Sequence, residues 1–178
     1  MGAGRLVVIA GGIGGSGLTL EAARERVAQS LGALNERASA AGVRLALEPI
    51  HPADLTIKGC VNSIHQALEL VQPLSSTDLV IDTFHSAWDA DIWRLAELAG
   101  DKAAVVQVCN WYEPSPDEKP QRDLPSRGSM DLATWLRALV ASGFAGPIEF
   151  EMFDRHRRGR TVPELLSTAL RELREMLQ

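Results

Sequence analysis

Short apolar runs alternate along the chain with longer segments in which apolar residues recur every three or four positions. Five runs rich in apolar and β-branched residues have the length of strands: residues 5–10, 43–48, 78–82, 103–109 and 147–153. Several are apolar without interruption, which is typical of strands buried on both faces of a parallel sheet. The pattern therefore predicts a sheet of five parallel strands.

Helical patterns separate these runs. The longest, residues 20–41, places apolar residues on one face and stops at Gly42. The others cover residues 61–71, 91–98, 132–142 and 161–177. Repeated strand–helix alternation indicates an α/β fold with right-handed crossovers, contained in one domain over residues 1–178. A polar, proline-rich segment, residues 112–129, interrupts the alternation and is predicted to be a long loop.

Polar side chains gather where the predicted strands end. Glu48 ends the second run, Asp82 the third, Gln107 lies near the end of the fourth, and Glu151 lies in the fifth. Parallel strands open their carboxyl ends on one side, so these residues could surround one site. Three carboxylates and an amide oxygen suit a divalent cation. The alternative is that each acid is a helix cap or a solvated loop residue.

A glycine loop offers a competing interpretation. Residues 12–17 spell G-x-G-x-x-G between a strand and a helix, which is the pattern of a dinucleotide-binding loop. Glu48 would then bind the ribose. The separation of Gly17 from Glu48 exceeds the usual spacing of about 20 residues, which disfavours this alternative.

Composition narrows the classes of partner. The chain has 46% apolar and 23% charged residues and a net charge of −5, which is ordinary for a soluble globular protein and unfavourable for nucleic-acid or anionic-membrane binding. No apolar stretch approaches the roughly 20 residues of a membrane-spanning helix. The start lacks the features of a signal peptide, and two cysteines give no disulfide framework. We therefore expect a cytoplasmic protein that acts on a small-molecule substrate.

Five segments together resemble one superfamily. They read LALEPIHP (45–52), VIDTFHSAWDAD (80–91), VVQVCNW (105–111), RDLPSRGSMDL (122–132) and GPIEFEMF (146–153). Their order and contexts are similar to the sugar phosphate isomerase/epimerase superfamily, the xylose isomerase-like TIM barrels. The resemblance implies a divalent metal, Mn²⁺ or Mg²⁺ above Zn²⁺ or Co²⁺, held by Glu48, Asp82, Gln107 and Glu151. Many members carry His where this chain has Gln107.

The same resemblance implies a metal-dependent isomerase or epimerase of a small sugar, polyol or keto compound. Glu48 and Glu151 would exchange protons with carbon on opposite faces of the substrate, and His85 and Arg122 would bind it. By position alone, Lys58 and Trp111 are further candidates for substrate contact, and the basic run 155–160 could hold an acidic group. A related lyase or dehydratase, or a truncated non-catalytic domain that depends on a partner, is the alternative.

The chain is short for this resemblance. A complete barrel has eight strands in roughly 250 residues, whereas the motifs here match the fourth to eighth strand–helix units only. We therefore expect a partial (β/α)8 barrel with about five units, or alternatively an open parallel sheet. Both end strands would be free edges, so a homo-oligomer that covers the incomplete barrel is expected. A fragment of a longer enzyme would show the same pattern.

Overall fold

The fold is an α/β arrangement of strands and helices in alternation. A computed structural model describes residues 2–112, 115 and 119–178. The main elements are β1 (Arg5–Ile9), α1 (Leu20–Ala40), β2 (Arg44–Glu48), α2 (Ile64–Val71), β3 (Thr77–Asp82), α3 (Thr83–Ser86), α4 (Leu95–Ala99), β4 (Ala103–Val108), α5 (Leu132–Ala141), β7 (Ile148–Phe150) and α6 (Val162–Met176). Short 3₁₀ turns include Ala90–Arg94 before α4 and Asp154–His156 after β7.

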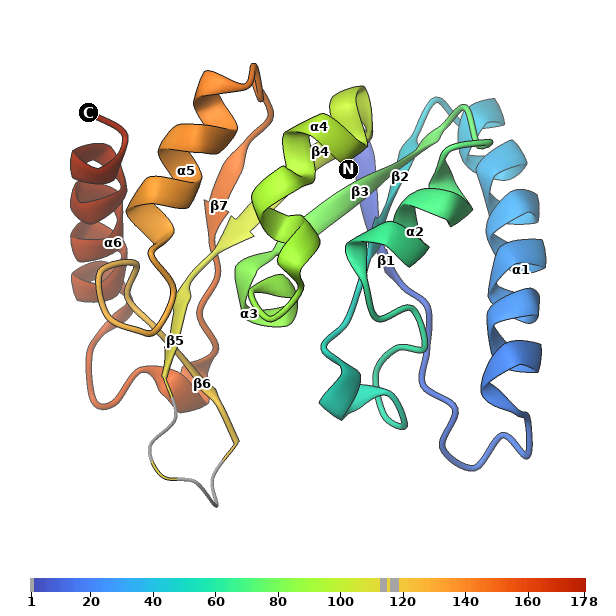
Figure 1. The fold of residues 1–178 in the computed structure, drawn as a ribbon, viewed down its shortest axis with the longest axis horizontal. Coiled ribbons are helices and arrows are strands. Elements are labelled where there is room, and N and C mark those ends of the chain that lie inside the picture. Colours follow the sequence, from blue (N-terminus) through green and yellow to red (C-terminus); the bar gives the residue numbers. More distant parts are fainter. Residues whose placement is uncertain (1, 113–114, 116–118) are drawn as a thin grey trace.

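Five of the strands form one parallel sheet in the order β1-β2-β3-β4-β7. Sequential strands are therefore neighbours, as in successive units of a barrel. Helices α2, α4 and α5 lie in front of the sheet in Figure 1, with α1 and α6 towards its two ends. The sequence-based prediction of a five-stranded parallel α/β fold is confirmed, and the strand bounds agree within two residues at most positions.

Local sequence explains where the helices begin. The side chains of Thr19, Ser63 and Asp131 each accept a hydrogen bond from a backbone N–H in the first turn of the helix that follows. At α6, Thr161 and Glu164 form a reciprocal capping box, and Pro163 occupies the first turn. These capping residues thus determine where each of the four helices begins.

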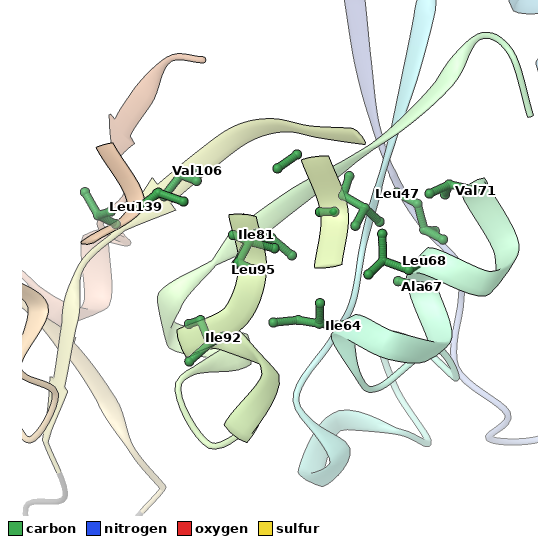
Figure 2. Close-up of a cluster of buried hydrophobic side chains, with 14 of the residues drawn as sticks. Leu47, Ile64, Ala67, Leu68, Val71, Ile81, Ile92, Leu95, Val106 and Leu139 are labelled. Carbon is green, nitrogen blue, oxygen red and sulfur yellow. The ribbon is translucent and has the colours of Figure 1, made fainter. Parts of the chain in front are cut away.

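The main core lies between the sheet and its helices (Figure 2). Leu47 and Ile81 point from the strands towards Ile64 and Leu68 of α2 and towards Leu95 of α4. The opposite face of the sheet has only a small apolar cluster, made by Ala46, Val80, Ala104 and Val105. Alternate residues along each strand thus pack against the helices, and the polar residues Glu48 and Asp82 stand at the last positions of β2 and β3.

One predicted element is wrong in type. Within the segment predicted as a loop over residues 112–129, Tyr112 ends β5 (Asn110–Tyr112), which pairs antiparallel with β6 (Gln121–Asp123). These short strands have no apolar alternation, and the buried Asn110 amide holds the loop that follows β6 by donating to the carbonyls of Pro125 and Met130. Pro114 and Pro116 of that segment lie outside the described residues.

The first strand is exposed on both faces. Leu6, Val7 and Ile9 of β1 are 58%, 42% and 47% exposed, although Val7 is aligned with the buried Ala46 of β2. β7 is the opposite edge of the sheet. The prediction that both ends of an incomplete barrel are uncovered agrees with this arrangement. Within the described part of the chain, no helix is long and apolar enough to cross a membrane.

Candidate active site

The candidate site lies at the carboxyl ends of the strands, on the lower side of Figure 1. Glu48 is the last residue of β2, Asp82 is the last of β3, and Glu151 directly follows β7. The backbone N–H of Glu151 donates to the Val108 carbonyl at 3.0 Å, so the sheet ladder continues up to this residue. The hairpin strand β6 brings Arg122 into the same place.

Arg122 joins two of the carboxylates. Its guanidinium donates to both carboxylate oxygens of Asp82, and its Nη1 lies 3.0 Å from a Glu151 oxygen. The group is only 1% exposed and lies between the rings of Phe84 and Phe153, at 4.5 Å and 4.7 Å from their centroids. Burial opposes the charge, but Asp82 and Glu151 outweigh that effect and raise the pKa of Arg122. Arg122 is a permanent cation.

Glu48, Asp82 and His85 offer a set of donor atoms for a metal ion. One atom from each of these buried residues lies within 4.8 Å of the other two. Gln107 is aligned with Asp82 in the sheet, and its amide donates to Glu149 at 3.4 Å. Glu149, two residues before Glu151, therefore lies one step deeper, beside Gln107.

The site carries more negative charge than Arg122 balances. Burial raises the pKa of Glu48 to about 8, and the neighbouring charges of Asp82 and Glu151 act in the same direction. Burial followed by repulsion from Asp82 raises the pKa of Glu151 to about 7. Both carboxyls thus titrate near neutral pH, which is the range that suits a group that accepts and returns protons. A bound cation would relieve the repulsion between them.

His85 is held as a neutral ring. Burial lowers its pKa to about 4, although Asp82 lies 4.0 Å from Nε2 and pulls the other way. The backbone N–H of His51 donates to Nδ1 at 3.3 Å, so the neutral ring carries its proton on Nε2. Nε2 is therefore a hydrogen-bond donor beside Asp82. This tautomer favours contact with a substrate oxygen over metal ligation.

A cleft of about 640 Å³ opens beside these residues. Its walls include Phe84, Trp88 and Trp111, and its rim carries Lys58 and Arg155. The Lys58 ammonium lowers the pKa of Glu48 and of Glu151, so it lies close enough to act on both carboxyls. The cleft is formed by loops that leave four different strands.

All eight residues predicted for the site lie at this end of the sheet. Asp82 and Arg122 are in direct contact, as are Arg122 and Glu151; Glu48 and His85 adjoin Asp82. Gln107 bonds to Glu149, and Lys58 and Trp111 line the cleft. Phe84 and Phe153, which enclose Arg122, were not predicted, because their only sequence signal is proximity to Asp82 and Glu151.

The glycine loop has a structural explanation. The backbone N–H groups of Ile13 and Gly14 donate to the carbonyls of Leu55 and Thr56, so they are not available to a pyrophosphate. A Cβ on Gly12 or on Gly14 would lie 2.5 Å from the Thr56 carbonyl oxygen. Close packing against residues 55–56 accounts for these glycines, and the dinucleotide-binding alternative loses its support.

Sequence comparison identifies related enzymes. The sequence model of a family described as "Xylose isomerase-like TIM barrel" matches residues 1–176. The chain is 33% identical over 135 residues to 3-dehydroshikimate dehydratase of Pseudomonas aeruginosa, covering 72% of this chain and 20% of that protein. It is 30% identical over 147 residues to L-ribulose 3-epimerase of Mesorhizobium japonicum, covering 79% of this chain and 46% of the epimerase. The chain thus spans less than half of either relative.

Solved structures share the fold. A crystal structure of a Sinorhizobium meliloti protein superposes with a TM-score of 0.85 at 33% identity, covering 99% of this chain and 66% of that one. The IolI protein with a bound zinc atom superposes with a TM-score of 0.75 at 25% identity, covering 97% of this chain and 62% of IolI. Nearly all of this chain therefore corresponds to about two thirds of these proteins.

Proposed function

The chain belongs to the xylose isomerase-like TIM barrel family, and from this premise we propose that it is a divalent-metal-dependent isomerase or epimerase. Its substrate is a small sugar, polyol or related keto compound, and its chemistry is proton transfer at the carbon beside a carbonyl. One observation carries the proposal: the carboxyls of Glu48, Asp82 and Glu151 lie together at the ends of their strands, where Arg122 joins Asp82 to Glu151 and Glu48 adjoins Asp82.

The residues of the site fit a divalent cation. Glu48 and Asp82 belong, with His85, to one cluster of donor atoms, Arg122 joins Asp82 to Glu151, and Gln107 is aligned with Asp82 in the sheet and offers a neutral amide oxygen. Glu48, Asp82, Gln107 and Glu151 are the proposed ligands. An oxygen-rich set favours Mn²⁺ or Mg²⁺, while the zinc in IolI makes Zn²⁺ or Co²⁺ a further choice. When bound, such an ion polarises a carbonyl and its adjoining hydroxyl, which acidifies the neighbouring C–H.

The side chains have separate roles in this proposal. Glu48 and Glu151 accept and return the carbon-bound proton from opposite faces, and burial raises the pKa of both carboxyls towards the neutral range that suits this role. His85 donates its Nε2 proton to a substrate oxygen. Arg122 is buried against Asp82 and Glu151, so it positions these carboxylates. The expectation that Arg122 also touches substrate stays a prediction.

A dehydratase is the second candidate, favoured by 33% identity to 3-dehydroshikimate dehydratase. The same two carboxyls would serve. One removes the proton beside the carbonyl as the C–H electrons form a carbon–carbon double bond. The other donates its proton to the departing hydroxyl, and water leaves.

One experiment separates the candidates. Mn²⁺-loaded protein is incubated in D₂O with L-ribulose and, separately, with 3-dehydroshikimate. An epimerase incorporates deuterium at carbon as it inverts the centre, whereas a dehydratase yields an aromatic product that absorbs in the ultraviolet. Glu48→Gln and Glu151→Gln should each lower the rate by about 100-fold or more.

A different outcome would contradict the proposal that this chain is itself catalytic. If the protein binds Mn²⁺ and both compounds, yet neither exchanges a proton nor loses water, the chain is a binding domain without its own activity. That result would support the partner-dependent alternative.

A further inference from the structure

The rim of the cleft is positively charged in a protein whose net charge is −5. Among the described residues that line it, Lys58, Lys119 and Arg155 carry positive charge, and Asp54 is the acid. His51 and His156 also line it; burial lowers the pKa of both, so neither adds charge at neutral pH. The described lining thus has an excess of two positive charges.

These cations converge from three separate segments. Lys58 comes from the loop after β2, Lys119 precedes β6, and Arg155 follows β7. Lys58 Nζ lies 3.0 Å from Asp54, and Lys119 Nζ lies 3.9 Å from the same carboxylate. Asp54 therefore balances only one of the two ammonium groups. The Arg155 guanidinium lies over the Phe153 ring at 4.9 Å, and its Nε donates to His156, which leaves its terminal nitrogens for another partner.

The distribution of charge along the cleft has two poles. The carboxyls Glu48, Asp82 and Glu151 lie beside the cleft, outside its lining, whereas the cations line it together with the aromatic side chains Phe84, Trp88 and Trp111. A neutral polyol offers nothing to the positive rim. A molecule with an oxyanion at one end and a hydroxy-ketone at the other complements both poles, and its carbon skeleton can lie against the aromatic walls.

We propose that the rim residues Lys58 and Arg155 form an oxyanion subsite, so that the substrate of this chain is a keto compound bearing a carboxylate or phosphate group. This inference rests on the proposed function for the role of the carboxyls, and it goes beyond it by assigning the substrate a charge. Lys58 has the central role because its side chain lines the cleft and is only 33% exposed, so its charge is less screened by solvent. Lys119, with an 80% exposed side chain, contributes long-range attraction.

Binding of three probes tests the subsite, with the protein loaded with Mn²⁺. The probes are 3-dehydroshikimate (a carboxylate), L-ribulose 5-phosphate (a phosphate) and neutral L-ribulose, followed by tryptophan fluorescence and by calorimetry. At least one anionic probe should bind about tenfold more tightly than L-ribulose, and Lys58→Gln should remove most of that preference. The preferred anionic probe identifies the group. Added salt should weaken the anionic probe alone.

The control is Arg171→Gln, which removes one positive charge from the exposed face of α6, outside the residues that line the cleft. It should leave all three affinities unchanged. The subsite would be overturned if wild-type protein bound charged and neutral probes with equal affinity. It would also be overturned if Lys58→Gln lowered the affinity for charged and neutral probes by the same factor. Tight anion binding by a protein that shows no Mn²⁺ affinity would instead overturn the proposed function and leave the subsite standing.

Discussion

At the scale of single residues, the site consists of charged side chains grouped around the buried carboxylate of Asp82. Its carboxylate is 0% exposed and tolerates burial because Arg122 donates to both of its oxygens. Among the residues that the structure describes, no Arg or Lys side chain bonds to Glu48, and burial raises its pKa to about 8. Arg122 thus pairs directly with Asp82, whereas the charges of Asp82 and Glu151 add to the effect of burial on Glu48.

Removal of the buried cation should be costly. Arg122→Met leaves Asp82 and Glu151 without their shared partner, so we expect a loss of roughly 3–5 kcal/mol in the free energy of unfolding. Urea unfolding at neutral pH measures it. Arg122→Lys keeps one charge but cannot bind both Asp82 oxygens, and should fall between wild type and Arg122→Met. Equal stability of all three proteins would show that the ion pairs contribute nothing.

Stability of the metal-free protein should fall as pH rises towards 8. The pKa values of Glu48 and Glu151 are higher in the folded than in the unfolded chain, so the folded state holds these protons more tightly. Their stabilising contribution is complete below the ordinary carboxyl pKa of 4.5 and is lost progressively as pH rises from there through about 7 for Glu151 and about 8 for Glu48. The melting temperature should therefore drop between about pH 5 and about pH 8.

Mn²⁺ supplies the matching test. Because it binds the deprotonated carboxyls, Mn²⁺ should raise the melting temperature more at the higher pH than at the lower. Glu48→Gln removes one of the titrating groups and should flatten the pH dependence of the metal-free protein. An unchanged slope in that variant would mean that other groups cause it.

At the scale of elements, the sequence predicts correctly those strands and helices whose local hydrophobic pattern agrees with their packing in the fold. Apolar runs and capping residues predicted the parallel strands and the long helices, because both signals act over a few neighbouring residues. The β5–β6 hairpin was missed because three-residue strands such as Asn110–Tyr112 are stabilised by side chains distant in sequence. The same holds for the site. The predicted strand ends were enough to find Glu48 and Asp82, but the contact between Arg122 and Asp82 could not be predicted because the β5–β6 hairpin makes it.

The glycine loop offers a prediction at this scale. Gly12→Ala places a methyl group 2.5 Å from the Thr56 carbonyl, so the loops must separate, at a cost of about 1–3 kcal/mol. Gly32→Ala is the matched control, because Gly32 lies inside α1 with nothing near its Cβ position. This control should be stabilised by roughly 0.5–1 kcal/mol. Chemical denaturation of both variants checks the pair, and a neutral Gly12→Ala would refute the packing explanation.

At the scale of the whole molecule, both ends of the sheet expose apolar surface. Leu6, Val7 and Ile9 are exposed on β1. On α6, beside the opposite edge strand β7, the exposed residues Val162, Leu166 and Leu170 are spaced four apart and form one stripe. Relatives of known structure are about half as long again as this chain, which covers 66% and 62% of two of them. A free strand edge and an apolar helix face are the surfaces on which proteins associate.

We therefore propose that copies of this chain associate through these ends, since each copy presents both an apolar strand edge and an apolar helix stripe. The mass in solution, measured by light scattering on a sizing column, should exceed the 19.3 kDa of one chain and rise with protein concentration. Val7→Lys places a charge on the free edge and should lower the mass towards that of a single chain. Val140→Lys, at an exposed apolar position on α5 that belongs neither to the β1 edge nor to the α6 stripe, should leave it unchanged. A single chain at every concentration would refute association, whereas an equal effect of the two lysines would show that the free edge is not the interface.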